Sequence, residues 1–200
     1  MHVFRWSWGL LLLALAAGTP AFAQQLTIFG GYSYLRPSLT YKQASECPSA
    51  CPAVPGSVTR HPNLNGYEFS ASYRIFPFVG IKADFSGHYG SAAGSSSAHV
   101  QTYLFGPELT FPAKVAPFVH ALAGVGHQAV GAGSGSSNGV PVVILSSSEN
   151  AFAAALGGGI DLHVASFLSF RAIQLDYVVT HFHSGTHGQP RAATGIVLRF

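Results

Sequence analysis

The densest group of potentially reactive side chains lies in the segment THFHSGTHG, which covers residues 180–188. It combines one serine with three histidines: Ser184, His181, His183 and His187. A serine nucleophile needs a histidine as base and a third group that orients the histidine. In an extended strand Ser184 would face away from both of the nearest histidines, and no acidic residue follows Asp176. We therefore predict no catalytic residue in this segment and no enzyme activity.

The two cysteines, Cys47 and Cys51, lie close together in the segment ECPSACP. In an exported chain such a pair favours a disulfide within one loop. A metal site would need further ligands, and His61 is the only weak candidate nearby. In the segment 180–188 only His181 and His183 would share a strand face. We therefore predict a Cys47–Cys51 disulfide, no metal site and no cofactor.

Residues 1–23 have the features of a secretory signal peptide. One basic residue, Arg5, precedes an apolar run over 8–17 that is too short to span a bilayer as a helix. The segment ends on Ala21-Phe22-Ala23, which matches an A-x-A cleavage site. We expect one domain over residues 24–200, following the signal peptide.

The composition is unusual for a soluble domain. Charged residues make up 8% of the chain, against about 25% in average proteins. The mean hydropathy is +0.31, yet no stretch after residue 23 approaches the roughly 18 apolar residues of a membrane helix. The net charge of +3 leaves no basic stripe, which argues against nucleic acid as a partner.

The hydrophobic pattern has a period of two, which predicts strands. Residues 66–75 place Tyr67, Phe69 and Tyr73 on one face, while Glu68 and Arg74 lie on the other. The segment 117–128 is apolar on both faces, and we assign His120 to the inner one. In total the pattern predicts eight strands over the ranges 26–35, 66–75, 79–89, 99–111, 117–128, 151–163, 170–182 and 191–200.

The connections between these strands alternate in length. Short links are expected over 76–78, 112–116 and 164–169, and long ones over 36–65, 90–98, 129–150 and 183–190. Outer-membrane barrels show this alternation, with short periplasmic turns and longer extracellular loops. We predict that the Ser/Gly-rich stretches 90–98 and 131–139 are flexible. The predicted fold is all-β, an eight-stranded antiparallel up-and-down transmembrane β-barrel.

Five of the seven acidic residues fall on the polar strand faces. A sheet can cross a membrane only if it closes, and its apolar face then meets lipid. A soluble sandwich or lipocalin-like barrel would share the alternation, but its solvent face would then consist mostly of Gly, Ala and Ser. We predict a charge network in the barrel interior, formed by Glu68, Arg74, Lys82, Asp84, Glu108, Asp161, Asp176 and Arg199.

The interior of an eight-stranded barrel is just wide enough to be filled by side chains. Mixed charges in that space should pair, because an unpaired buried charge is costly. We expect the network to be a salt-bridged plug. The alternative is a gate, in which rearranged pairs open a small ion path.

Several segments resemble the small outer-membrane β-barrel proteins of the OmpA/OmpX type. They include FGGYSYLR (29–36), GYEFSASYRIFPFVGIKADFSGHYG (66–90), YLFGPELTF (103–111) and TGIVLRF (194–200). The resemblance implies the outer membrane of a Gram-negative-type bacterium, contact with its lipid and lipopolysaccharide, and a monomer. It also implies that Ile196, Leu198 and Phe200 form the signal read by the barrel-assembly machinery.

The resemblance implies a structural, minor-pore or surface-interaction role. One alternative is an adhesin that binds an extracellular partner through its long first loop. Another is a lipid-modifying enzyme, since some barrels of this size are lipid A deacylases with a His-x-Ser motif. The His-x-His-Ser spacing of 181–184 departs from that motif.

Overall fold

The computed structural model describes residues 25–45, 56–182 and 185–200. The predicted signal peptide and the predicted Cys47–Cys51 disulfide lie outside the described residues and stay predictions. Within the described ranges, no helix has both the length and the apolar character needed to cross a membrane.

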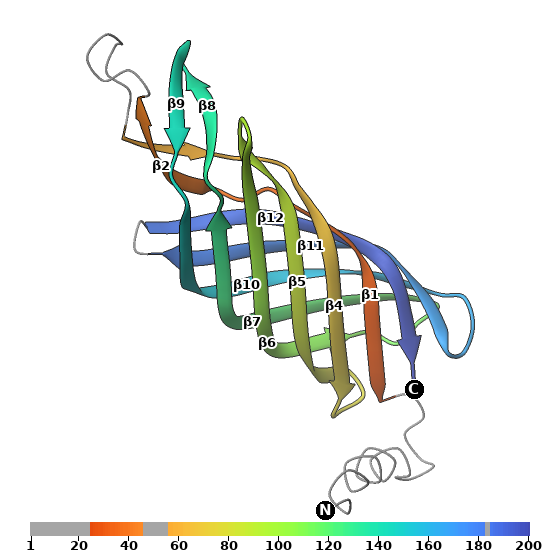
Figure 1. The fold of residues 1–200 in the computed structure, drawn as a ribbon. Coiled ribbons are helices and arrows are strands. Elements are labelled where there is room, and N and C mark those ends of the chain that lie inside the picture. The colour runs from red at the N-terminus through yellow and green to blue at the C-terminus, as the bar shows by residue number, and fades with distance from the viewer. Residues whose placement is uncertain (1–24, 46–55, 183–184) are drawn as a thin grey trace, which may run out of the picture.

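Eight strands form one closed antiparallel barrel, as the sequence predicts (Figure 1). Strand β1 pairs with β12 from Thr27 opposite Arg199 to Leu35 opposite Arg191, and this pairing closes the sheet. Closure leaves the barrel without exposed strand edges over the paired residues. The strands are β1 (Leu26–Leu35), β4 (Leu64–Arg74), β5 (Val79–Ala93), β6 (Ser96–Thr110), β7 (Val115–Val130), β10 (Ser147–His163), β11 (Leu168–Phe182) and β12 (Gly185–Arg199).

A second sheet stands on the barrel at the end opposite the termini (Figure 1). Its four strands are ordered β3-β2-β9-β8 and comprise β2 (Leu39–Ser45), β3 (Ser57–Arg60), β8 (Gly133–Ser137) and β9 (Val140–Ile144). We call it the outer sheet. It is built from the connections 36–65 and 129–150, which the sequence analysis treated as loops.

The prediction that 131–139 is flexible is therefore wrong. Strands β8 and β9 form a hairpin whose turn, Asn138-Gly139, has φ values of 52° and 81°. Two successive residues with positive φ suit the twist of a tight hairpin. The Ser/Gly composition of β8 gives no strand signal by itself, and β8 is held by pairing with the Val-rich β9.

Two other expected loops are also mostly strand. Strands β5 and β6 continue to a turn at Gly94 and Ser95, so the prediction of a flexible 90–98 is wrong. Strand β12 begins at Gly185 rather than at residue 191. Pairing with β11 from Phe182 opposite Gly185 extends it, although polar residues and Pro190 conceal the pattern.

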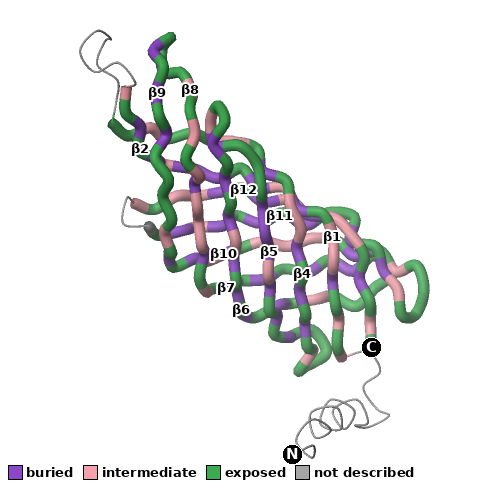
Figure 2. The backbone as a smooth tube through the Cα atoms, viewed as in Figure 1, coloured by how far each residue is buried: buried purple, intermediate pink, exposed green. Residues whose placement is uncertain are grey.

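Large apolar residues are exposed on the outer face of the barrel wall. Exposed and buried residues alternate along the strands (Figure 2). Leu156 is 69% exposed and Phe105 57% exposed, although both belong to regular strands. On β7, His120 lies inside with Phe118 and Leu122, as predicted.

The alternation is broken once in β11. The register with β12 shifts between Arg171 and Gln174, so that Ala172 and Ile173 are both exposed. Strict alternation would turn Ala172 inward together with Gln174, but the bulge inserts one extra residue and Ala172 faces outward. The effect of the bulge is that Arg171 points inward together with Gln174 and Asp176.

Candidate functional site

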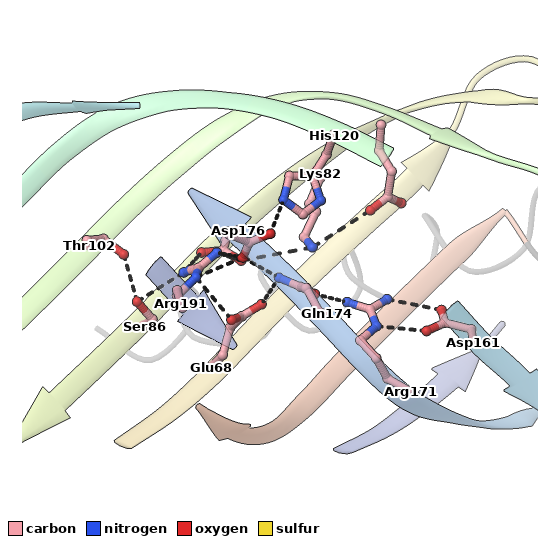
Figure 3. A network of polar contacts seen from close by, with 12 residues as sticks. Glu68, Lys82, Ser86, Thr102, His120, Asp161, Arg171, Gln174, Asp176 and Arg191 are labelled. Atoms are coloured by element: carbon pink, nitrogen blue, oxygen red, sulfur yellow. Dashed lines mark hydrogen bonds and ion pairs between the residues drawn. The ribbon is translucent and has the colours of Figure 1, made fainter. Parts of the chain in front are cut away.

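Arg191 is the centre of the charge network inside the barrel (Figure 3). Its Nη1 donates to Asp84 Oδ1 at 2.8 Å, and its Nη2 donates to Asp176 Oδ2 at 2.6 Å. Its Nε lies 3.5 Å from Glu68 Oε2, and Nη1 also donates to Ser86 Oγ at 3.2 Å. The side chains of all four charged residues are almost fully buried. One guanidinium thus holds three carboxylates together.

A second guanidinium, that of Arg171, lies closer to the end of the barrel that holds the termini. Its Nε and Nη2 donate to the two oxygens of Asp161, at 2.8 and 3.0 Å. The guanidinium carbon lies 4.3 Å from the ring centre of Phe29 and 4.1 Å from that of Phe118. Such paired bonds and aromatic stacking suit arginine better than lysine.

Gln174 connects these two groups (Figure 3). Its Oε1 accepts a hydrogen bond from Arg171 Nη1 at 2.6 Å. Its Nε2 donates to Glu68 Oε1 and to Asp176 Oδ2, both at 2.7 Å. The network is therefore continuous from Asp161 to Asp84.

Lys82 and His120 complete the network on the opposite wall. Lys82 Nζ lies 3.8 Å from Glu108 Oε2 and 4.0 Å from Asp84 Oδ2. His120 Nε2 lies 2.9 Å from Asp176 Oδ1. Each buried carboxylate thus has a basic side chain within reach, which offsets part of the cost of burying it.

The structure places six of the eight predicted network residues together in the interior: Glu68, Lys82, Asp84, Glu108, Asp161 and Asp176. Arg74 and Arg199 are instead partly exposed at the end with the termini, and within the described ranges neither has an ion pair within 4.0 Å. They lie at the ends of their strands, where the interior opens to solvent.

Three central members of the network are not among the residues predicted from the sequence: the cations Arg171 and Arg191 and the linking Gln174. Strict alternation from Arg199 puts Arg191 on the inner face. Arg191 is, however, the first residue of the predicted strand 191–200, so the sequence places it at a strand end rather than inside the wall. Arg171 is concealed by the bulge, because a regular strand would turn it outward with Ile173.

An apolar cluster fills the barrel end beneath the outer sheet. Leu39 and Tyr41 of β2 and Ile144 of β9 pack with Leu35 and Leu64 from the ends of β1 and β4. We call this cluster the apolar plug. Ala92, Ala98, Val100 and Val130 from the wall belong to it as well. The outer sheet is therefore joined to the barrel by a shared core.

At the opposite end a cavity of about 20 Å³ lies between Arg74, Glu108 and Arg171. This volume holds about one water molecule. The buried charge network thus lies between a one-water cavity at one end of the barrel and the apolar plug at the other.

The histidine segment does not form a centre within the described residues. His181 is exposed, and its Nδ1 lies 2.7 Å from Thr186 Oγ1 on the neighbouring strand. His183 and Ser184 lie outside the described residues. In the ranges that the structure covers, no three His, Cys, Asp or Glu side chains are grouped so that they could hold a metal ion.

The residues of the predicted assembly signal lie on the closing strand. Ile196 and Leu198 face outward, and Phe200 is exposed at the end of the wall. The backbone N–H of Phe200 donates to Leu26 O at 2.9 Å, and the N–H of Leu26 donates to Phe200 O at 3.2 Å. These bonds continue the β1–β12 seam to the last residue.

No protein-family model and no curated protein matches the chain. Solved structures do match. Neisserial surface protein A is 14% identical, with a TM-score of 0.59, and the match covers 90% of this chain and 99% of that one. Ail of Yersinia pestis is 16% identical, with a TM-score of 0.53, covering 88% and 99%.

The outer membrane protein OprG of Pseudomonas aeruginosa is 9% identical, with a TM-score of 0.53, and the match covers 89% of this chain and 96% of that one. At such identities the likeness concerns the fold alone. The closed antiparallel barrel and these neighbours together show that the chain has the fold of the small eight-stranded outer-membrane β-barrels.

Proposed function

We propose that the chain is an integral, monomeric protein of a bacterial outer membrane, with the outer sheet at the cell surface and the termini in the periplasm. The exposed apolar side chains on the wall support this placement, because lipid is the solvent that such a surface requires. The burial of five carboxylates inside the barrel supports it as well. A charged side chain on the lipid face costs up to about 2–4 kcal/mol at mid-depth for Arg or Lys, and less for Asp or Glu.

We further propose that the barrel is closed to steady ion flow and acts at the surface through the outer sheet. The observation that carries this proposal is the apolar plug, which both seals the interior and fixes the sheet to the wall. A sheet held by a packed core presents the same surface to a partner at all times, so little ordering cost accompanies binding.

Exposed cations on the outer sheet support an acidic partner. Lys42 of β2 and Arg60 of β3 are exposed. Lys42 stands opposite Ser57 and Arg60 opposite Leu39, so the two cations lie on opposite faces of the outer sheet, near its β3 edge. Ail, one of the fold neighbours, has been crystallised in complex with the heparin analogue sucrose octasulfate. For this chain we propose that a polyanionic partner outside the cell binds around the β3 edge of the outer sheet and contacts both residues there.

The test has two parts. Protein refolded in a planar bilayer should give no steady single-channel conductance. If it conducts ions steadily, the closed barrel is refuted and the minor-pore role is favoured instead. Cells that display the protein should adhere to an immobilised sulfated glycan, and Lys42→Gln with Arg60→Gln should reduce this adhesion. Lys114→Gln, which removes a cation at the opposite end, is the matched control. Equal adhesion of all variants would refute the proposed partner.

A further inference from the structure

A serine, a histidine and an asparagine lie in hydrogen-bonding order on the outer wall of the barrel. His127 Nδ1 is 2.7 Å from Asn150 Oδ1, and His127 Nε2 is 3.5 Å from Ser148 Oγ. His127 belongs to β7, and the other two belong to the adjacent strand β10. In the register of these strands His127 stands directly opposite Asn150. The three side chains are thus brought together by regular strand pairing.

The hydrogen-bond partners set the protonation of the imidazole. A carbonyl oxygen such as Asn150 Oδ1 only accepts, so His127 Nδ1 carries the hydrogen and donates it. His127 Nε2 then has a free lone pair, which accepts from the Ser148 hydroxyl. This is the order of nucleophile, base and orienting group that activates a serine. The 3.5 Å separation is long, but such bonds often tighten only when substrate binds.

A surface hollow of about 470 Å³ gives substrate access to this group. Ser148, His127 and Gln101 line it, together with His99. Gln101 stands opposite His127 on the other side, on β6, and its side-chain Nε2 lies 3.5 Å from Tyr89 Oη. The hollow therefore gives access to the candidate nucleophile and its base.

The position of the hollow on the wall points to a substrate class. Two residues further down the same outer faces lie Val125 and Phe152, which are 57% and 60% exposed and belong to the apolar surface. Above them the same outer faces carry the polar residues His127, Ser148 and Asn150. In the proposed membrane orientation this is the level at which the ester bonds of outer-leaflet lipids meet the headgroups. The apolar wall below would lie along the acyl chains.

We propose that Ser148, His127 and Asn150 form the catalytic group of a hydrolase for acyl esters of membrane lipids. Ser148 Oγ attacks the ester carbonyl carbon while its proton passes to His127 Nε2. The C–O bond to the alcohol breaks, and the alcohol leaves with that proton. Water then attacks the acyl-serine, gives one proton to Nε2, and frees the fatty acid as Ser148 regains the proton. Asn150 is a positioning residue that holds the imidazole.

Only the lipid nature of the substrate rests on the proposed membrane location. The test therefore uses two substrates on the refolded full-length domain. A water-soluble p-nitrophenyl acyl ester in detergent measures the catalytic group alone, and phosphatidylglycerol vesicles measure release of fatty acid from a bilayer. Labelling by a fluorophosphonate, with mass spectrometry of the modified peptide, identifies the nucleophile.

We expect the label on Ser148, and a loss of about 10²-fold or more in ester hydrolysis for Ser148→Ala and for His127→Phe. Ser57→Ala, at an exposed position of the outer sheet outside this hollow, should keep its rate. Asn150→Leu should lose activity, and Asn150→Asp, which keeps an acceptor oxygen, should restore it. Circular dichroism checks that each variant retains the barrel.

Each result decides the matter. Hydrolysis of the soluble ester without hydrolysis of the lipid would support the catalytic role of the three residues and refute a membrane lipid as the substrate. No hydrolysis and no labelling above the Ser148→Ala level would overturn the proposal, while leaving the barrel and its surface role intact. Equal rates for Ser148→Ala and Ser57→Ala would also overturn it.

Discussion

Replacement of Arg191 by methionine removes the cation that three buried carboxylates share. The side chain of Arg191 is 1% exposed, and its bonds to Asp84 and Asp176 are 2.8 and 2.6 Å long. Glu68 lies 3.5 Å away. Methionine fills much of the same volume but carries no charge, so packing changes little while the carboxylates lose their partner. Lys82 and His120 remain, but each is already beside a carboxylate.

Removal of one partner from a buried ion pair costs about 3–5 kcal/mol. Because Arg191 serves several carboxylates, we expect a loss of about 4–5 kcal/mol in the free energy of unfolding. With a urea m-value of about 2 kcal/mol/M, the unfolding midpoint should fall by about 2 M. Both tryptophans, Trp6 and Trp8, lie in the predicted signal peptide. Unfolding is therefore followed by circular dichroism or by gel mobility of unheated samples.

The control is Arg60→Met, at an exposed position on β3, which should shift stability by no more than about 0.5 kcal/mol. A second change, Asp176→Asn, should recover part of the loss in the Arg191→Met background. The reasoning is refuted if Arg191→Met unfolds within about 1 kcal/mol of the parent, since the carboxylates would then not depend on this cation.

Three further predictions concern the wall, the plug and the closing strand. Leu156→Arg should cost about 2–4 kcal/mol of stability in lipid vesicles, because the outward charge would lie in hydrocarbon. The cost should be much smaller in detergent micelles, where water reaches the wall more easily. Equal costs in vesicles and in micelles would argue against a lipid-facing wall. Ile144→Ser should make the outer sheet sensitive to protease on intact cells while the barrel still resists heat on gels, and a sheet that stays protected would show that the apolar plug is not what holds it. Phe200→Ala should lower insertion in cells more than refolding in detergent, since we propose that Phe200 is read during assembly; an equal loss in both would make it a packing residue.

The sequence was sufficient for the barrel because one local rule operates along most of the wall. Alternation places Phe69 outward and Glu68 inward, and the same rule assigns His120 to the interior. These assignments need only the period of a strand and the requirement that a membrane sheet be closed. Six interior charges followed from that rule alone.

The outer sheet could not be found in this way. Strand β8 consists of glycine and serine, and its order comes from hydrogen bonds to β9. Strand β2 pairs with β9, which is about a hundred residues away in the chain. Pairing over such a separation depends on where the barrel brings the two connections, and no local pattern records it.

The sequence by itself determined the barrel, the outward apolar surface and the concentration of acids inside it, because each depends on side-chain type at a fixed spacing. The tertiary structure decided how the charges are paired. The bulge at Arg171 turns that cation inward, and closure of the barrel brings Arg191 of β12 beside Asp84 of β5 and Asp176 of β11. It also decided that His127, Ser148 and Asn150 meet, since only the β7–β10 register brings a histidine beside residues more than twenty positions away.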